Sequence, residues 1–495
     1  MESLSPEVLL LIIPHLCQEP PILRLKPWDP RWGQMPILNI ASYAVISRSW
    51  QYAVERFTMA DIHTHSSDLL SFREIFSRPR RRQTLRRLEY EIDLPVFSAN
   101  RVSRSERHKE RDKAFKKGLI DLFDGLATWD KQGVYLAITT SSSVDLGHRP
   151  LDLDMGLWPR YRTLRDIYLS SDNAELPELS CIGSLYIPDV ERYLYPSVIA
   201  WIISSLPGLE SLRLKLNAPA PRKKELQEYR LALAKALDSP SLSNLKELYI
   251  SFEESIPLNH SYETQAEDPV YPDGDVLNLS LRRLAETAPL ESLVLTGWWP
   301  ISPALFNGTA PFPYLQDLHI DAAMLTYDGR WYYTGNPDSV DPHFQFDTDE
   351  DEGSDSDPSI ISEDTEAANG QGEAVLNDDE PQHLWRTEPD PQMFDALMKS
   401  MAEAMNRMPR LLGLEFRMGV YPTGDHAISF EYSATGHVPC GDRCRDTLSQ
   451  WAAKWEIPDE ILKLWRERLG WEGVILLQGW LAARQWSRLY LHNDS

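Results

Sequence analysis

A short stretch near the C-terminus holds the residues with the most obvious capacity for chemistry. His437, Cys440 and Cys444 lie close together in the sequence. Imidazole and thiolate groups at such spacing are ligands that zinc prefers. A fourth ligand is not evident nearby, so we expect no metal site there and no cofactor.

The sequence motifs typical of enzymes are missing. The chain has no G-x-x-x-x-G-K-[ST] phosphate loop, no G-x-S-x-G elbow, no H-E-x-x-H pair and no G-x-G-x-x-G turn after a strand. Carboxylates are numerous, but the sequence alone pairs no two of them across a cleft. We therefore expect a protein that is not an enzyme and that acts by binding.

Negative charge is concentrated in one segment of the chain. The formal net charge is −24 over 495 residues, and much of it lies between Asp341 and Asp390. Such an acidic stretch cannot bury enough apolar surface to offset its ordering entropy, so residues 334–391 should form a disordered insertion. The remainder is only mildly acidic, and because phosphate binding needs clustered Lys and Arg, a diffuse acidic surface argues against nucleic acid as the main partner.

The cysteine content and the N-terminus indicate the compartment. Four cysteines are too few for a disulfide framework, which suggests a reducing environment. The first residues lack the basic start and cleavage site of a signal peptide. The aliphatic run Val8–Ile13 is far shorter than the about 20 residues that a bilayer span needs. We predict a cytoplasmic and/or nuclear protein that does not engage a membrane.

Internal repetition is the most informative feature of the sequence. Six segments share the order leucine, two residues, an aliphatic residue, one residue and another apolar residue. Several follow a proline turn and a segment with helical periodicity. The six segments are Leu164–Leu169, Leu209–Leu214, Leu245–Ile250, Leu290–Leu295, Leu315–Ile320 and Leu411–Phe416. Helix, turn and short strand in succession predict an α/β fold with a parallel sheet and outer helices.

The predicted repeats are irregular in length. They lie about 25 to 45 residues apart until the acidic insertion, whereas regular leucine-rich repeats run about 20–29 residues. We predict an irregular leucine-rich-repeat solenoid over residues 61–333, with its last repeat over 392–435. An earlier unit would comprise a helix at Phe115–Leu126 and strands near Leu88 and Val134. The Trp-rich residues 436–495 should form a helical cap, with a partner-binding helix pair as the alternative.

The outward side chains of the repeat strands are candidates for binding. The fourth and sixth positions of each repeat should point into the core, which leaves the fifth position pointing out. These fifth positions are Tyr168, Arg213, Tyr249, Val294, His319 and Glu415. This mixture of aromatic and charged groups suits a protein-binding surface. We predict that they bind a target protein, with ordinary solvated strand residues as the alternative.

Residues 1–60 read as a separate helical unit. Ser3–Leu16 contains a short apolar helix, and Ile40–Trp50 contains an amphipathic helix that ends in tryptophan. A unit this small is expected to need a partner or the solenoid to pack against.

The apolar positions of these two helices resemble the F-box, the module that docks on a Skp-type adaptor of cullin–RING ubiquitin ligases. The family usually has proline directly after its first leucine, where this chain has Ser5 and then Pro6. The segments Leu88–Pro95 and Asp328–Tyr333 are also similar to those of fungal F-box-like proteins. The resemblance implies that the adaptor contacts Leu4, Pro6, Glu7, Val8, Ile12, Leu16, Val45 and Trp50.

The resemblance implies a substrate-recognition subunit of a Skp–cullin–RING ubiquitin ligase. Its partners would be the adaptor, a cullin and an unidentified target protein, and ubiquitin transfer would belong to other subunits. The alternative is a non-catalytic leucine-repeat scaffold without ligase recruitment. The two hypotheses differ in whether the apolar faces of the N-terminal helices are exposed or are buried against the first repeat.

Overall fold

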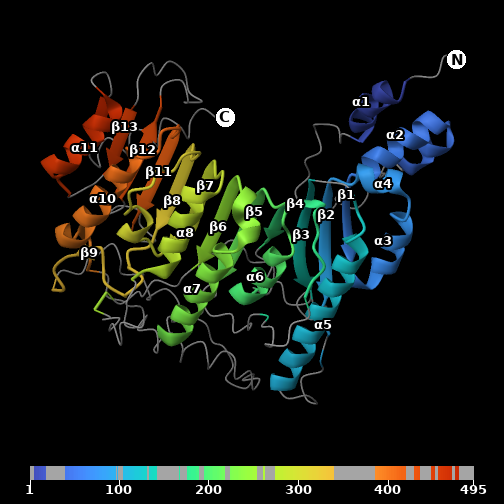
Figure 1. Ribbon diagram of the computed structural model, residues 1–495, viewed down its shortest axis with the longest axis horizontal. Helices are drawn as coiled ribbons and strands as arrows, with labels where there is room; N and C mark the ends of the chain where they lie inside the picture. Colours follow the sequence, from blue (N-terminus) through green and yellow to red (C-terminus); the bar gives the residue numbers. More distant parts are fainter. Residues whose placement is uncertain are drawn as a thin grey trace, which may run out of the picture. The chain divides into compact units, whose positions relative to one another are not determined.

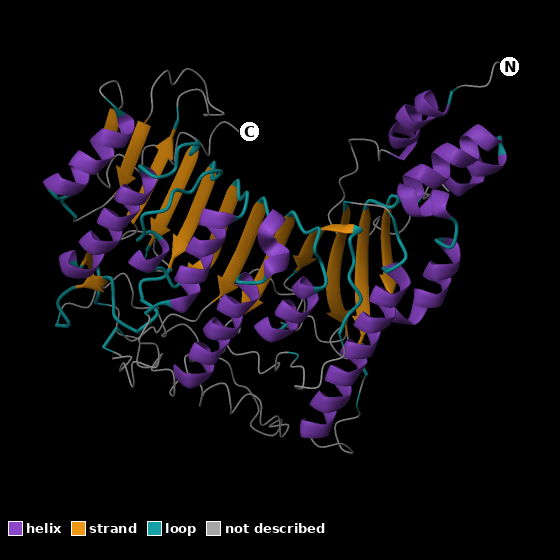
Figure 2. Cartoon of the chain, viewed as in Figure 1, coloured by secondary structure: helices purple, strands orange, loops and turns teal. Residues whose placement is uncertain are grey.

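The chain has a mixed α/β structure in which a mostly parallel sheet is flanked by helices (Figures 1 and 2). The chain divides into two compact units: unit 1 comprises residues 1–146 and 175–190, and unit 2 comprises 147–174 and 191–495. A computed structural model describes residues 5–17, 40–95, 97, 104–130, 133–141, 167, 175–188, 194–217, 223–253, 260–261, 274–338, 385–419, 428–434, 447–451, 455–470 and 474–478.

Unit 1 begins with a small helical module made of α1 (Pro6–Cys17), the 3-10 helix η2 (Ile40–Val45) and α2 (Arg48–Thr58). Leu9 and Ile13 of α1 pack against Ala53 and Val54 of α2, and these four side chains are buried. The predicted single helix over Ile40–Trp50 is wrong, because Ser47 has an extended backbone and caps a new helix at Arg48.

The rest of unit 1 is a parallel sheet with helices. Its strands follow the order β1 (Asp61–His65), β2 (Arg87–Asp93), β3 (Val134–Ser141) and β4 (Ile182–Ile187). The helices are α3 (Leu69–Ile75), α4 (Pro79–Thr84) and α5 (Arg104–Leu126), with the 3-10 turn η3 (Ser66–Asp68) between β1 and α3. The predicted helix before Leu126 and the predicted strands at Leu88 and Val134 are confirmed.

Unit 2 contains the longer run of strands. From β5 to β11 the neighbouring strands are parallel, β12 is antiparallel to both of its neighbours, and β14 is parallel to β13. The order is β5 (Ser211–Asn217), β6 (Glu247–Glu253), β7 (Ser292–Trp299), β8 (Asp317–Ala322), β11 (Gly413–Met418), β12 (Ile428–Ser433), β13 (Thr447–Trp451) and β14 (Val474–Gln478).

Helices cover one face of these strands. In the view of Figure 1, helices of unit 2 lie over the near face of its strands. They are α6 (Pro196–Ser204), α7 (Lys223–Leu237), α8 (Val276–Thr287) and α10 (Pro391–Met405). Shorter elements are η5 (Pro240–Asn244) and η6 (Pro303–Leu305). Among the described helices, none has both the length and the apolar character that a membrane crossing requires.

Five of the six repeat segments form strands of unit 2, namely β5, β6, β7, β8 and β11. Their fourth and sixth positions are all at most 3% exposed, which confirms the predicted inward direction. These residues are Leu212, Leu214, Leu248, Ile250, Leu293, Leu295, Leu318, Ile320, Leu414 and Phe416. Of the first segment, Leu164–Leu169, only Ile167 lies within the described residues, where it forms a parallel bridge with Leu194.

The predicted helical cap over residues 436–495 is wrong. The described part of this segment contains one helix, α11 (Asp459–Leu469), and the two strands β13 and β14. Trp465 is buried and its ring lies 5.4 Å from that of Phe430, while Trp455 contacts Phe394 at 4.9 Å. The tryptophans that the structure describes here therefore contribute to the core of the sheet's end, as aromatic residues commonly do beside strands.

The two described ends of the acidic insertion lie side by side. Strand β9 (Tyr333–Thr334) pairs antiparallel with β10 (Glu388–Pro389). Arg386 lies over the rings of Trp331 and Trp385, at 5.0 and 4.2 Å, and donates to the Tyr333 carbonyl at 3.0 Å. The chain therefore leaves and re-enters the fold at one place. The body of the predicted insertion lies outside the described residues.

A bulge near the end of β7 redirects one tryptophan into the core. Gly297 and Trp298 both have positive φ, and the register with β8 shifts between Leu295 and Trp299. The shift buries Trp299 completely, and its indole donates to the side chain of Asn278 at 3.0 Å. A Cβ atom at Gly297 would lie 2.9 Å from the Phe252 carbonyl oxygen, so only glycine fits this position.

We predict that Gly297→Ala destabilises the chain more than Gly470→Ala does. Both glycines have positive φ, which costs alanine about 1–2 kcal/mol, but the Gly470 position has no atom within 4 Å of an added Cβ. The contact with Phe252 should add about 1–3 kcal/mol of overpacking to the first variant alone. Thermal unfolding of both variants measures the difference, and equal losses of stability would show that the close approach at Gly297 is unimportant.

Candidate functional site

The fifth positions of the repeat strands form one row across unit 2. In register, Arg213 pairs with Tyr249, Tyr249 with Val294, Val294 with His319, and His319 with Glu415. We call these five residues the outer row. Arg213 is exposed and the other four side chains are half-buried, whereas their neighbours along each strand are buried. The structure thus brings together five of the six predicted target-binding residues, and Tyr168 lies outside the described residues.

The acidic end of the outer row is built around His319. Its Nδ1 atom lies 2.8 Å from Glu415 Oε2, and its Nε2 atom lies 3.3 Å from Asp321 Oδ2. Hydrogen bonds to Asp321 and Glu415 raise the pKa of His319 to about 9, although burial acts in the opposite direction. The hydrogen bond from His319 in turn lowers the pKa of Glu415, which also pairs with Arg417. His319 is therefore a cation at neutral pH, held between two carboxylates.

The other end of the outer row is basic and aromatic. Arg213 lies 3.8 Å from Glu247, and both side chains are more than half exposed. Tyr249 accepts a hydrogen bond from Thr296 at 3.3 Å, which fixes its hydroxyl on the surface of the sheet. The outer row thus runs from the guanidinium of Arg213 through a phenol, an aliphatic group and an imidazolium to the carboxylate of Glu415. Such a sequence of groups is chemically suited to contact with another protein.

The predicted adaptor-binding residues occupy the helical module of unit 1. Val8 and Val45 are 41% and 87% exposed, and Glu7 is also exposed. Ile12 and Trp50 are half-buried, and the Trp50 ring stacks on Tyr43. Leu4 lies outside the described residues. Pro6 and Leu16 lie in α1, and their side chains are not described.

Three exposed apolar residues of this module were missed by the sequence reasoning, and one of them, Phe57 of α2, is 38% exposed. Leu11 is 72% exposed and Ile46 is 59% exposed. Leu11 lies three residues after Val8 and so shares its side of α1, whereas Leu9 and Ile13, four residues apart, face α2. The helical spacing of the sequence could therefore have predicted which side of α1 is exposed and which side faces α2. We call Val8, Leu11, Val45 and Ile46 the exposed apolar group.

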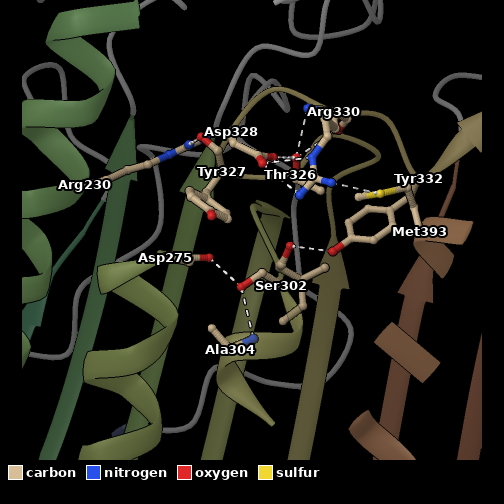
Figure 3. A network of polar contacts seen from close by, with 11 residues as sticks. Arg230, Asp275, Ser302, Ala304, Thr326, Tyr327, Asp328, Arg330, Tyr332 and Met393 are labelled. Atoms are coloured by element: carbon tan, nitrogen blue, oxygen red, sulfur yellow. Dashed lines mark hydrogen bonds and ion pairs between the residues drawn. The ribbon is translucent and has the colours of Figure 1, made fainter. Parts of the chain in front are cut away.

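A buried polar network lies at the start of α8 (Figure 3). The carboxylate of Asp275 accepts from the Asn278 backbone at 3.2 Å, the Asn278 amide at 2.5 Å and the Ser302 hydroxyl at 2.7 Å. Burial raises the pKa of Asp275, and these hydrogen bonds oppose the rise. Because both carboxylate oxygens have donors, the network joins the start of α8 to the segment after β7.

A cavity of about 190 Å³ adjoins this network. Ser302, Tyr327, Arg330, Tyr332 and Met393 contribute to its lining. Ligand pockets usually measure about 300–1,000 Å³, so this cavity is small for a substrate. Asp275 lies behind Ser302 and does not line it. The geometry gives the network a structural role.

Comparison of the chain with protein-family models, with curated proteins and with solved structures gave no match. The candidate zinc ligands His437, Cys440 and Cys444 lie outside the described residues. Among the described residues, the outer row and the exposed apolar group are the two candidate binding surfaces.

We predict a pH-dependent contribution of His319 to stability. Its pKa rises from 6.5 to about 9 on folding, so the folded chain retains a proton that the unfolded chain releases in this range. The stabilisation is complete below about pH 6.5 and is lost as the pH rises through about 9. Melting temperatures of the native chain and His319→Gln should differ most near pH 6 and converge above pH 9. A difference that stays constant over this range would contradict the ion cluster.

Proposed function

We propose that the chain is the substrate-recognition subunit of a Skp–cullin–RING ubiquitin ligase. In this proposal the helical module of unit 1 is an F-box that binds a Skp-type adaptor. The strands and helices of unit 2 belong to a leucine-rich-repeat solenoid whose outer row binds a target protein. Ubiquitin transfer would be carried out by other subunits of the ligase.

The observation that carries the adaptor role is the exposed apolar group of the helical module. Val8, Leu11, Val45 and Ile46 are between 41% and 87% exposed, next to a small core to which four of the described residues contribute buried side chains. Single exposed apolar residues are common, but several on so small a module suggest an interaction site. Burying each of them against a partner would contribute about 1.5–3 kcal/mol.

The way in which the module is attached supports the same proposal. Helix α2 leads directly into β1, and Glu55 of α2 forms an ion pair with Arg81 of α4 at 3.0 Å. Tyr52 of α2 also lies under the guanidinium of Arg80 at 4.5 Å. These contacts are polar and use α2, so they leave the exposed apolar group available. Helices that merely capped a solenoid would bury those apolar side chains.

The departure from the usual F-box pattern has a structural explanation. The Ser5 hydroxyl accepts from the Val8 backbone at 3.4 Å, and α1 begins at Pro6. Serine is a favoured N-cap residue, and proline is well tolerated at the first helical position. Placing proline one residue later therefore keeps α1 helical from its first turn, with Val8 and Leu11 on the exposed side.

The target-binding role is supported by the partly exposed outer row of unit 2. Parallel sheets usually have both faces covered, whereas leucine-repeat solenoids keep one face of the sheet for binding. Here the fourth and sixth positions of five strands are buried, and the outer row between them remains partly exposed. Its in-register mixture of aromatic and charged groups is the kind of surface that protein partners use.

We predict that Leu11→Asp with Val45→Asp weakens binding of a Skp-type adaptor by at least about 30-fold. Loss of central apolar contacts at an interface costs about 2 kcal/mol or more, and each 1.4 kcal/mol is tenfold in affinity. Leu70→Asp in α3 is the matched control, since Leu70 is 78% exposed but lies outside the module. Affinities can be measured by calorimetry with purified adaptor and full chain.

The outcomes of this experiment separate the two hypotheses. Tight binding by the native chain and by Leu70→Asp, with loss in the double variant, is the expected result. Absence of binding by a well-folded native chain would overturn the adaptor role and favour a scaffold without ligase recruitment. Equal loss in the double variant and in Leu70→Asp would indicate a general effect of added charge.

A further inference from the structure

The edge of the unit 1 sheet carries a cluster of histidines and carboxylates. His63 and His65 lie on the same face of β1, because alternate residues of a strand share a face. Strand β2 runs parallel beside it, and Glu91 is the register partner of His65. The backbone pairing of β1 and β2 therefore brings three metal-binding side chains together from two segments of the chain.

Both imidazoles converge on one carboxylate. Glu91 Oε2 lies 3.0 Å from His63 Nε2, and Glu91 Oε1 lies 3.9 Å from His65 Nδ1. The two rings have centroids 5.0 Å apart. Each of the three residues offers one ligand atom, and these atoms all lie within 4.8 Å of one another.

We propose that His63, His65 and Glu91 bind a divalent transition-metal ion of the zinc class. Two imidazoles and one carboxylate are the ligand set of many zinc sites that leave a fourth position open to water or a substrate. Nickel and copper also accept imidazole, whereas magnesium and calcium require mainly oxygen ligands. The ion would tie the edge strand β1 to β2.

The side chains can close on an ion at little cost. A tetrahedral ion with bonds of about 2.1 Å places its ligand atoms roughly 3.4 Å apart, somewhat closer than they lie here. His63 and His65 are 51% and 39% exposed in their side chains, so their rings can turn without disturbing the core. Glu91 is 20% exposed and is the more fixed ligand.

A second carboxylate is placed to orient the site. Asp93 Oδ1 lies 3.2 Å from His65 Nδ1, and Asp93 Oδ2 accepts from Ser66 Oγ and the Ser67 backbone at 3.0 Å each. Metal-bound histidines commonly hydrogen-bond such an outer carboxylate, which fixes the ring and its tautomer. Asp93 is thus a positioning residue if His65 binds the ion through its other nitrogen.

The cluster around His319 shows what a simple charge pair looks like in the same chain. There one imidazole lies between two carboxylates, which satisfy both of its nitrogens. At β1 two imidazoles lie beside one another instead, and the ligand atoms of His63, His65 and Glu91 all fall within 4.8 Å of one another. Two imidazoles and one carboxylate this close together make a three-ligand metal set.

The test is calorimetric titration of the full chain with Zn²⁺ alone, near neutral pH. His63→Ala and His65→Ala should each weaken one zinc site by at least about 100-fold, since loss of an outer-shell group alone costs 10–100-fold. Glu91→Gln should weaken the same site, and zinc should raise the melting temperature of the native chain but not those of these three variants. Asp61→Asn, on the exposed edge of the same strand, is the matched control and should bind as the native chain does.

His437→Ala separates this site from the sequence cluster at His437, Cys440 and Cys444. The site at β1 should survive in that variant, and Co²⁺ bound there should give visible bands without the thiolate charge-transfer band that cysteine ligands produce. No zinc binding by the native chain would overturn the proposal. Binding that persists in both His63→Ala and His65→Ala, or that is lost only in His437→Ala, would also overturn it. Because the His63 and His65 side chains are 51% and 39% exposed, circular dichroism of His63→Ala and His65→Ala should match that of the native chain.

Discussion

Alternate residues of a strand point to opposite faces of a sheet, and the rest of this structure depends on that constraint. In β5, β6, β7, β8 and β11 the buried leucines and isoleucines face the helices, so parallel pairing in register leaves the intervening residues on the other face. A shift of one residue in any of these strands would turn its outer-row residue into the core and expose the two apolar residues beside it. The core and the outer row are therefore fixed by the same interaction.

The same alternation produces surfaces of different chemistry in the two units. In unit 2 it aligns His319 with Glu415, which are 96 positions apart in the sequence, and so creates a cationic imidazole between carboxylates. In unit 1 it aligns His63 and His65 with Glu91. The helical module follows a different periodicity, in which Leu9 and Ile13 are buried and Val8 and Leu11 are exposed. Each surface follows from the element that carries it.

The sequence predicted those parts of the fold that local pattern determines. Repeat strands were found because leucines at fixed spacing follow helices, and the outward direction of Arg213, Tyr249, Val294, His319 and Glu415 follows from strand geometry.

Strands β13 and β14 were missed because tryptophan-rich segments fit helix and strand alike, and pairing with β12 decides between them. The cluster of His63, His65 and Glu91 was missed because its members come from separate strands, although the alternation Asp61-x-His63-x-His65 was a signal. Leu11 was missed because the predicted adaptor-binding residues of α1 were taken from the family resemblance and not from helical spacing.

Side-chain footprinting with hydroxyl radicals, on the chain alone and in complex with a Skp-type adaptor, tests the central claim most directly. If the helical module recruits the ligase and the outer row is kept for a target, the adaptor should protect Val8, Leu11, Val45 and Ile46 from oxidation. Tyr249 and His319 should react as they do in the chain alone. Protection of the outer row by the adaptor, or a complex that leaves the exposed apolar group fully reactive, would contradict this account.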